Sequence, residues 1–444
     1  MAWNKFELAT SGTSSTKGKI ATVSRIPNSM EAWWIGDNGS VQASYWYEGM
    51  QQWQRYELAP AGSASPSGGI CAVSRIPNSM EVWWVGADGS IQDAYWYEGA
   101  QWQRFELAPP GSASNSSDVS AVSRIPNSME VWWVGDNGSI QDAYWYESAQ
   151  WQRLELAPAG SASTSGGICA VSRIPTSMEA WWIGNSGAVQ ASYWYEGMQQ
   201  WQRYELAPNG SASPNSEISA VSRITNSMEV WWVGANGSIQ DAYWYEGAQW
   251  QRFELAPAGS ASTIGGVSSV SRITNSMEVW WVGANGSIQD AYWYEGAQWQ
   301  QFELAPPGSA SDSGDVSSVS RIPDSMEVWW IGVNGSIQDA YWYADSVNPP
   351  NSINPAITVR FINNQGNFLE VTGGGFTPNR SVKLSYLIKD QGSVTTTTSG
   401  TESLMCDGSG KFLFQTRVTS VNASFAQAKA IDEASGAQAT GSTE

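Results

Sequence analysis

Apolar and polar residues alternate in short runs along most of the chain, a pattern typical of half-buried β-strands. In one representative stretch we expect strands at residues 218–223, 228–234, 239–245 and 250–256, where aromatic and β-branched residues are enriched. Between the second and third runs, Ala235-Asn236-Gly237-Ser238 predicts a two-residue hairpin turn, because Asn-Gly tolerates positive φ. The stretch as a whole therefore predicts a four-stranded sheet.

This stretch is one of seven copies of a repeat. The segment Ser-Arg-Ile-x-x-Ser-Met-Glu-x-Trp-Trp recurs every 49 or 50 residues, close to the period of propeller blades. Each copy has four tryptophans, and seven copies account for all 28 in the chain. Four-stranded sheets repeated seven times around an axis make an all-β fold, a seven-bladed β-propeller. The arginine that marks each copy is Arg25, Arg75, Arg124, Arg173, Arg223, Arg272 or Arg321.

The first residues of the chain supply the strand that the last copy lacks. After Tyr343 the sequence leaves the repeat, so the seventh copy has no fourth strand. Residues 3–9, Trp-Asn-Lys-Phe-Glu-Leu-Ala, match the fourth strand of the other copies. We therefore expect the N-terminal strand to close the last blade, which removes an unpaired strand edge from the ring. The predicted propeller covers residues 1–345.

A second domain is predicted after the repeats. Residues 346–355, rich in Pro and Asn, predict a linker, and tryptophan is absent beyond it. Six or seven short alternating runs in residues 356–444 predict a small β-sandwich of the immunoglobulin or fibronectin type. This part contains no recognisable metal, nucleotide or catalytic motif, so a spacer or association module is the simplest interpretation. A homo-oligomer formed through it is compatible with this organisation.

Composition narrows the range of functions. The 444 residues carry a net charge of −19, which argues against a nucleic-acid partner. No window reaches 18 consecutive apolar residues, so we expect no membrane insertion. The absence of histidine excludes His-based catalysis and His-ligated zinc, and we predict no catalytic residue, no metal and no cofactor. No secretory signal is visible, although export by another route is compatible with the sequence, and the compartment stays open.

The repeat resembles that of the bacterial seven-bladed propeller lectins of the Photorhabdus type. The resemblance covers residues 1–345 and all seven copies, through the motif Ser-Arg-Ile-x-Asn-Ser-Met-Glu-Val-Trp-Trp and the later Tyr-Trp-Tyr-Glu. It implies sugar binding at several sites per ring, with fucose or O-methylated monosaccharides and their glycans as partners. It implies nothing about residues 356–444.

The residues also point to carbohydrate without the resemblance. A sugar ring is bound by an aromatic platform together with polar groups of fixed geometry, and every copy repeats Arg, Glu, Trp and Tyr. The turn between the first and second strands lies at the same end of the blade as the turn between the third and fourth. We therefore place the pockets at this end, between neighbouring blades. The predicted sugar-binding residues are Arg25, Glu31, Trp33, Tyr47, Trp53, Arg75, Glu81, Trp83, Tyr97, Trp102, Arg124, Glu130, Trp132, Tyr146, Trp151, Arg173, Glu179, Trp181, Tyr195, Trp201, Arg223, Glu229, Trp231, Tyr245, Trp250, Arg272, Glu278, Trp280, Tyr294 and Trp299.

Deviations between copies predict unequal sites. Copies one and four are one residue longer before their last tryptophan, where they carry Met50 and Met198, and they lack an aspartate found in the other copies. At the seam, Ala344 replaces a glutamate, so the seventh site is expected to be altered or lost. The sequence thus predicts five or six working sites, or two classes of site.

Three other interpretations compete with a multivalent, non-catalytic lectin. Each tryptophan could simply fill the space between blades, because propeller blades pack face to face. A propeller glycoside hydrolase would use two carboxylates, but an active site is one asymmetric arrangement, whereas these carboxylates repeat around the ring. A protein-interaction scaffold would need a single distinctive patch, which a uniform ring does not offer. Repeated weak sites gain avidity instead, which favours the lectin.

Overall fold

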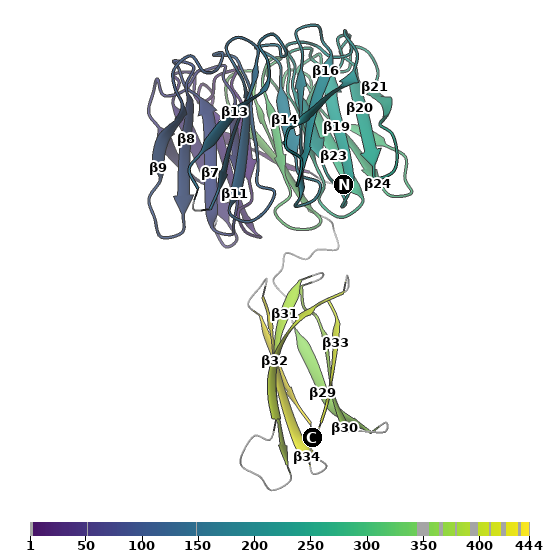
Figure 1. Cartoon of the computed structure of the whole chain (residues 1–444). Coiled ribbons are helices and arrows are strands. Elements are labelled where there is room, and N and C mark those ends of the chain that lie inside the picture. The colour runs from purple at the N-terminus through teal and green to yellow at the C-terminus, as the bar shows by residue number, and fades with distance from the viewer. Residues whose placement is uncertain are drawn as a thin grey trace. The chain divides into compact units, whose positions relative to one another are not determined.

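The computed structural model describes residues 3–50, 52–147, 149–343, 355–363, 367–377, 380–390, 398–407, 410–418, 423–433 and 437–443. The chain divides into two compact units, Met1–Ala344 and Asp345–Glu444 (Figure 1). All regular elements of the described residues are β-strands, and no helix among them is long and apolar enough to cross a membrane. Except for Pro355, the linker predicted at 346–355 lies outside the described residues.

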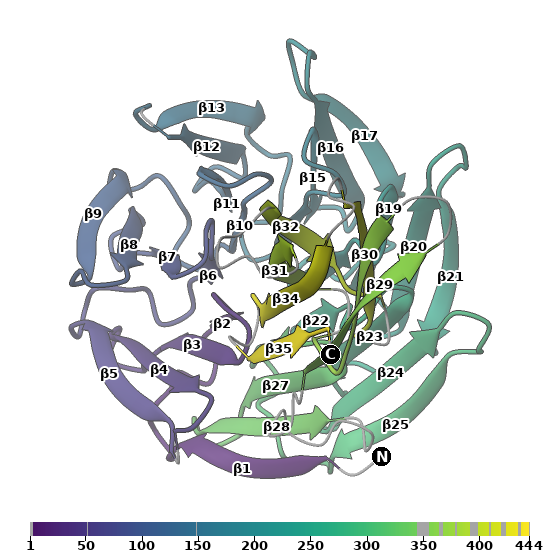
Figure 2. The ribbon, with the colours of Figure 1, turned by 90° about the horizontal axis from the view of Figure 1, so that it is seen from below.

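Seven four-stranded antiparallel sheets surround a central axis in the first unit, so the predicted seven-bladed propeller is confirmed (Figure 2). We number the blades 1 to 7 in chain order. The inner strands are β2 (Ile20–Val23), β6 (Ile70–Val73), β10 (Val119–Val122), β14 (Ile168–Val171), β18 (Ile218–Val221), β22 (Val267–Val270) and β26 (Val316–Val319). The second strands are β3 (Ser29–Ile35), β7 (Ser79–Val85), β11 (Ser128–Val134), β15 (Ser177–Ile183), β19 (Ser227–Val233), β23 (Ser276–Val282) and β27 (Ser325–Ile331). The third strands are β4 (Val41–Tyr47), β8 (Ile91–Tyr97), β12 (Ile140–Tyr146), β16 (Val189–Tyr195), β20 (Ile239–Tyr245), β24 (Ile288–Tyr294) and β28 (Ile337–Tyr343). The outer strands are β5 (Gln54–Ala59), β9 (Gln103–Ala108), β13 (Gln152–Ala157), β17 (Gln202–Ala207), β21 (Gln251–Ala256), β25 (Gln300–Ala305) and, for blade 7, β1 (Asn4–Ala9).

The N-terminal strand closes the ring as the sequence predicts. β1 pairs with β28 in antiparallel register, with Asn4 opposite Tyr341 and Phe6 opposite Asp339. Blade 7 therefore contains the two ends of the repeat region in one sheet (Figure 2). Each of the other outer strands follows its own third strand through a short turn, so only blade 7 depends on a pairing between distant segments.

The paired tryptophans of the second strand form the packing core between blades. Successive strand residues point to opposite faces, so Trp231 faces blade 6 and Trp232 faces blade 4. Both are at most 1% exposed, and the same pairs are buried in all seven blades. Replacing such a buried tryptophan by alanine costs roughly 3–5 kcal/mol, so these residues hold the ring together.

The hairpin between the second and third strands differs from the predicted two-residue turn. In blade 1, Gly39 N–H donates to Gly36 O at 2.9 Å, and Gly36 N–H donates to Ser40 O at 2.9 Å. Only Gly39 has positive φ, whereas Asn38 accepts a hydrogen bond from Ser40 N–H on its side-chain oxygen. A Cβ at residue 39 would lie 2.5 Å from Ala64 O, so glycine is required by the following loop as well as by the turn.

A cluster of charges lies where the inner strands begin. Lys19 forms an ion pair with Glu217 of blade 5, on the far side of the axis, and also interacts with Asp118 and Asp315. Burial raises the pKa of Asp118 to about 6, which the charge of Lys19 opposes. Glycine alternates with the acids because a Cβ there would meet a carboxylate oxygen at 2.6–2.8 Å. The seven equivalent positions are Lys19, Gly69, Asp118, Gly167, Glu217, Gly266 and Asp315.

The second unit consists of two sheets around one apolar core. One sheet has the order β29 (Ala356–Asn363), β30 (Asn367–Gly374), β33 (Phe412–Arg417). The other has the order β32 (Thr398–Met405), β31 (Ser381–Asp390), β34 (Ala423–Asp432), β35 (Gln438–Ser442). Leu369 and Val371 of the first sheet pack with Val382 and Leu384 of the second, which makes the unit a β-sandwich.

We predict that Lys19→Met lowers the free energy of unfolding by about 3 kcal/mol, because it leaves buried carboxylates without their cation. Lys17 lies two residues away and is exposed, so Lys17→Met should change stability by less than about 0.5 kcal/mol. Urea unfolding of the two variants measures both values. Equal effects of the two substitutions would contradict a role for Lys19 in neutralising the cluster.

Candidate functional site

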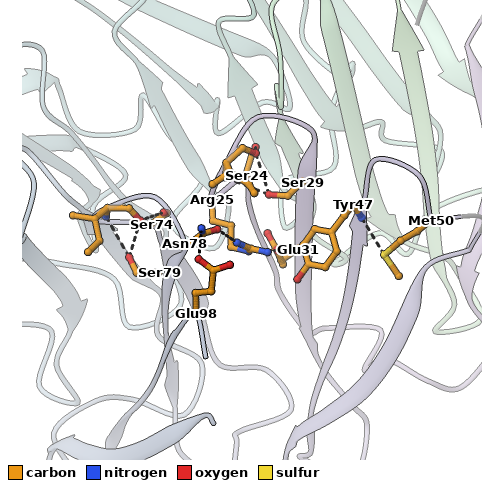
Figure 3. A network of polar contacts seen from close by, with 12 residues as sticks. Ser24, Arg25, Ser29, Glu31, Tyr47, Met50, Ser74, Asn78, Ser79 and Glu98 are labelled. Atoms are coloured by element: carbon orange, nitrogen blue, oxygen red, sulfur yellow. Dashed lines mark hydrogen bonds and ion pairs between the residues drawn. The ribbon is translucent and has the colours of Figure 1, made fainter. Parts of the chain in front are cut away.

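The turn between the inner and second strands fixes the position of the repeated arginine. In blade 1, the side-chain hydroxyls of Ser24 and Ser29 both donate to Ile26 O at 3.0 Å. Asn28, which precedes the second strand, has φ 63°, a left-handed conformation that asparagine tolerates better than most residues. These hydrogen bonds fix the conformation of the turn, which directs Arg25 toward the next blade (Figure 3).

Each arginine joins two neighbouring blades. The guanidinium of Arg25 lies over the ring of Tyr47 in its own blade at 4.7 Å and over Trp96 of blade 2 at 5.1 Å. Its Nη1 donates to the side-chain oxygen of Asn78 in blade 2 (Figure 3). The same stacking between a tyrosine and the next blade's tryptophan occurs at all seven arginines. Cation–π contacts of this kind contribute about 0.5–2 kcal/mol each.

The asparagine that receives the arginine also binds a glutamate. Asn78 donates from Nδ2 to Glu98 of its own blade at 2.6 Å, and Asn275 donates to Glu295 at 2.7 Å. Blade 4 has Thr176 at this position, and Arg124 donates to Pro175 O instead. Blade 7 has Asp324, which forms an ion pair with Arg272, and the sequence there has Ala344 in place of the glutamate.

Pockets lie beside these arginines, between adjacent blades. The pocket between blades 5 and 6 has a volume of about 480 Å³. The pocket between blades 7 and 1 has a volume of about 560 Å³. In each pocket one wall comes from the glutamate and tyrosines of one blade, and the other from a methionine and two tryptophans of the next. In pocket 5/6 the lining residues are Glu229, Tyr243, Tyr245, Phe253, Met277, Trp293 and Trp299.

The predicted residues of one copy belong to two different pockets. Arg223 approaches Glu229 and Tyr245, and these three lie together beside pocket 5/6. The last tryptophan of the same copy, Trp250, instead contacts Trp181 of blade 4 and faces the preceding pocket. Trp231 and its equivalents at positions 33, 83, 132, 181, 280 and 329 are 0% exposed. They lie beneath the site, where each supports the outer tryptophan of the next blade in an edge-to-face contact, such as Trp231 with Trp299 at 6.4 Å.

The sequence interpretation missed part of the site. It omitted the third-strand tryptophans, although each one stacks on an arginine of the preceding blade. Their strict repetition was the available signal, but repetition alone does not separate a pocket wall from interior packing. The omitted residues are Trp46, Trp96, Trp145, Trp194, Trp244, Trp293 and Trp342.

The seam carries a pocket that was expected to be altered or lost. Glu327, Tyr341 and Tyr343 of blade 7 line pocket 7/1 opposite Trp46 and Trp53 of blade 1. Arg321 stacks between Tyr343 and Trp46, as its equivalents do. Between blades 6 and 7, Trp3 contacts Trp280 at 6.2 Å, so the N-terminal segment supplies the missing outer tryptophan there.

Burial controls the charge of the pocket carboxyls. Glu229 is 4% exposed, and burial raises its pKa to about 8, which the nearby Arg223 opposes. The pKa of Glu31 is raised only to about 7, and Arg25 Nε donates to Glu31 at 3.0 Å. At these two sites one fixed cation therefore lies beside a carboxyl that can hold or lose a proton near neutral pH.

A second set of hollows lies at the opposite end of the blades, beside the Asn-Gly-Ser turns. Their volumes are about 550, 440 and 430 Å³ in blades 3, 2 and 5. The hollow of blade 5 is lined by Trp232, Gln240, Arg252, Phe253 and Glu254, and its one indole is only 1% exposed, whereas pocket 5/6 has several partly exposed rings. These hollows are the alternative location for a ligand.

Comparison with known proteins identifies the fold. No protein-family model and no curated protein sequence matches the chain. The chain is similar to the BP39L lectin from Burkholderia pseudomallei, with a TM-score of 0.68 and 21% identity, over 75% of this chain and 97% of that chain. It is also similar to AofleA from Arthrobotrys oligospora, with a TM-score of 0.52 and 13% identity, over 68% of this chain and 90% of that chain. At these identities the similarity shows the propeller fold.

We predict that the residues at 275 and 295 are energetically coupled. Asn275→Asp should lower the free energy of unfolding by about 1 kcal/mol more in a chain that has Glu295 than in a chain that carries Glu295→Ala. The reason is that the new carboxylate faces Glu295, and like charges repel. The double variant recreates the combination found at Asp324 and Ala344. Urea unfolding of the four proteins of this cycle measures the coupling, and strictly additive effects would refute it.

Proposed function

We propose that this protein is a multivalent, non-catalytic lectin whose sugars bind in the pockets between neighbouring blades. The observation that carries this proposal is the pocket found between blades 5 and 6 and again between blades 7 and 1. Its lining combines partly exposed Tyr and Trp rings with a glutamate, and an arginine beside it stacks on two of those rings. Aromatic faces suit the C–H face of a monosaccharide, and the charged groups suit its hydroxyls. The lectin named among the structures of similar fold supports the same function.

Fucose is the first candidate ligand, as the resemblance of the repeat implies, with O-methylated monosaccharides next. Fucose carries a methyl group, which Phe253 and Met277 in the lining of pocket 5/6 would accommodate better than they would a hydroxyl. Arg223 and Glu229 would bind ring hydroxyls from the same side of the pocket. The other predicted arginines and glutamates would act in the same way at their own sites.

The proposed site combines residues of two blades. At site 5/6 we assign sugar contacts to Arg223, Glu229 and Tyr245 of one blade and to Trp293 and Trp299 of the next. The fully buried second-strand tryptophans act as support, because no sugar reaches a side chain with 0% exposure. Since pocket 7/1 is present and Trp3 completes site 6/7, we propose seven sites per chain.

A hydrolase is less well supported by the same geometry. Two catalytic carboxyls must both reach the scissile bond, about 5–10 Å apart across the sugar. On the same face of the sheet as Glu229, the next carboxyl along the chain is that of Asp241. Its side chain is 0% exposed, so it does not reach a bound sugar. A chromogenic glycoside assay tests this directly, and turnover that is lost in Glu→Gln variants would replace the lectin by an enzyme.

The second unit, residues 356–444, has no proposed ligand. We propose that it is a spacer or association module, which leaves sugar binding to the propeller.

We predict that calorimetric titration with methyl α-L-fucoside gives seven sites per chain. Trp293→Ala should reduce this number to six, because it removes one wall of pocket 5/6. Arg252→Ala alters the hollow at the other end of blade 5 and should leave seven. The reverse result, or fucoside density only at the Asn-Gly-Ser end of soaked crystals, would refute the placement of the sites.

We also predict that a glycan array detects selective binding to fucosylated or O-methylated glycans. Binding of proteins irrespective of their glycans would instead favour an interaction scaffold.

A further inference from the structure

The pockets between blades differ in how far they extend, and nothing described above uses this difference. Pocket 5/6 includes Phe253 of the outer strand β21 but no later residue of that strand. Pocket 7/1, at about 560 Å³ the larger of the two, includes Phe6 at the equivalent position of β1 and continues along this strand to Leu8. It therefore has a part that lies beyond the rings assigned to the first sugar.

A side chain of blade 6 crosses to blade 5 at the level where pocket 7/1 continues. Gln301 on the outer strand β25 donates from Nε2 to Leu255 O of blade 5, at 2.5 Å. Lys5 on β1 donates in the same way from Nζ to Leu304 O of blade 6. Each of these two side chains connects the outer strands of neighbouring blades, so the space beside the leucine carbonyl is occupied in both cases.

Arginine holds this position in the other five blades and takes a different course. In blade 1 the guanidinium of Arg55 lies over the ring of Trp34 in its own blade, at 5.5 Å. Arg104, Arg153 and Arg252 line the hollows at the Asn-Gly-Ser end, each together with the equivalent tryptophan of its own blade. Among the described residues, only the glutamine and the lysine donate to the leucine carbonyl of the preceding blade.

The leucine carbonyl is available because the outer strand bulges there. The register of β1 with β28 shifts between Glu7 and Ala9, and the register of β21 with β20 skips Leu255 in the same way. A bulged residue has no partner in the strand ladder. Gln301 supplies a donor to Leu255 O, whereas no side chain among the described residues donates to Leu8 O. Pocket 7/1 therefore offers a backbone acceptor that a sugar hydroxyl would satisfy as the glutamine amide does in blade 5.

The longer loop of blade 1 adds a polar side chain to the same pocket. Tyr47 N–H donates to Met50 Sδ at 3.3 Å, and Met50 N–H donates to Tyr47 O at 2.9 Å, so the turn is closed around the extra residue. After this turn Gln52 lines pocket 7/1. Gln298, which also precedes an outer tryptophan, is not part of the lining of pocket 5/6. A primary amide both donates to and accepts from hydroxyls, so Gln52 suits a sugar.

Blade 4 has the same two features as blade 1. Its loop is also one residue longer, and Tyr195 N–H donates to Met198 Sδ at 3.3 Å. Gln200 precedes its outer tryptophan, and Arg203 takes the position of Arg55. The remaining blades have either the short loop with arginine or the short loop with glutamine, and blade 7 has lysine. The space between blades 3 and 4 therefore matches the space between blades 7 and 1.

We propose that sites 7/1 and 3/4 bind a disaccharide, whereas the other five sites bind its terminal sugar alone. The first sugar occupies the aromatic pocket, and the second lies along the outer strand. At site 7/1 one hydroxyl of the second sugar donates to Leu8 O and another contacts Gln52. Arg55 is a specificity-determining residue, because it leaves this acceptor free where a glutamine would occupy it. This inference rests on the proposed function, since it concerns the same pockets.

Calorimetric titration of the full-length chain tests the inference. The probes are methyl α-L-fucoside and four disaccharides, fucose α1-2 linked to galactose and fucose α1-3, α1-4 or α1-6 linked to N-acetylglucosamine. At least one disaccharide should bind two sites about tenfold more tightly than methyl α-L-fucoside does, because it gains hydrogen bonds there. Its affinity for the other five sites should equal that of the monosaccharide.

Two substitutions locate the tighter sites. Arg55→Gln gives blade 1 the residue of blade 6, so the new amide should bind Leu8 O and reduce the tighter sites from two to one. Gln52→Ala removes the polar wall and should have the same effect. In both variants methyl α-L-fucoside should still find seven sites, which shows that the first-sugar pockets persist. Circular dichroism checks that the fold is unchanged.

Matched controls place the same changes where the second subsite is absent. Arg104→Gln acts between blades 1 and 2, which lack the longer loop, and Gln298→Ala acts beside pocket 5/6, so each should leave two tighter sites. Equal affinity for the monosaccharide and every disaccharide at all seven sites would overturn the inference but not the lectin. Two remaining tighter sites in Arg55→Gln or in Gln52→Ala would also overturn it. No binding of any of the five probes would overturn the lectin proposal itself.

Discussion

The face-to-face packing of neighbouring blades is the interaction on which every candidate site depends. A guanidinium such as that of Arg223 is held between Tyr245 of its own blade and Trp293 of the next. Its position is therefore fixed only when both sheets are in place. The buried tryptophans set the distance between the sheets, and that distance sets the width of the pocket. Folding of the ring and formation of the site are therefore one event.

Closure of the ring makes the two ends of the repeat region depend on packing between blades as well. β1 completes blade 7, and Trp3 just before it contacts Trp280 of blade 6 in the position that an outer tryptophan takes elsewhere. Lys19, at the start of the first inner strand, meets acids from blades 3, 5 and 7. Seven is an odd number, so the alternation of glycine and acid around the axis cannot close on itself, and a cation occupies the remaining position.

The fold was predictable from the sequence because its information is periodic. The 49-residue repeat, the alternation within strands and the count of tryptophans specify blades, their number and the closing strand. The composition of each site was less predictable, because a pocket joins residues about 50 positions apart whose contact depends on how two sheets stack. Trp231 and Trp293 recur equally strictly, yet one is fully buried and the other lines the pocket. Strict repetition of a residue shows that its position is constrained, and both packing between blades and ligand binding impose such a constraint.

Differences among the copies are more informative than their similarities, because the seven blades are variants of one structure within a single chain. Asparagine gives way to Asp324 where the facing glutamate is replaced by Ala344, and aspartate with phenylalanine or leucine gives way to alanine with tyrosine in blades 1 and 4. In each case two residues change together: in the first, one facing carboxyl is kept beside the arginine, and in the second a buried carboxyl is lost where a phenol is gained. Such paired changes show which residues of neighbouring positions depend on each other, which strict repetition alone does not reveal.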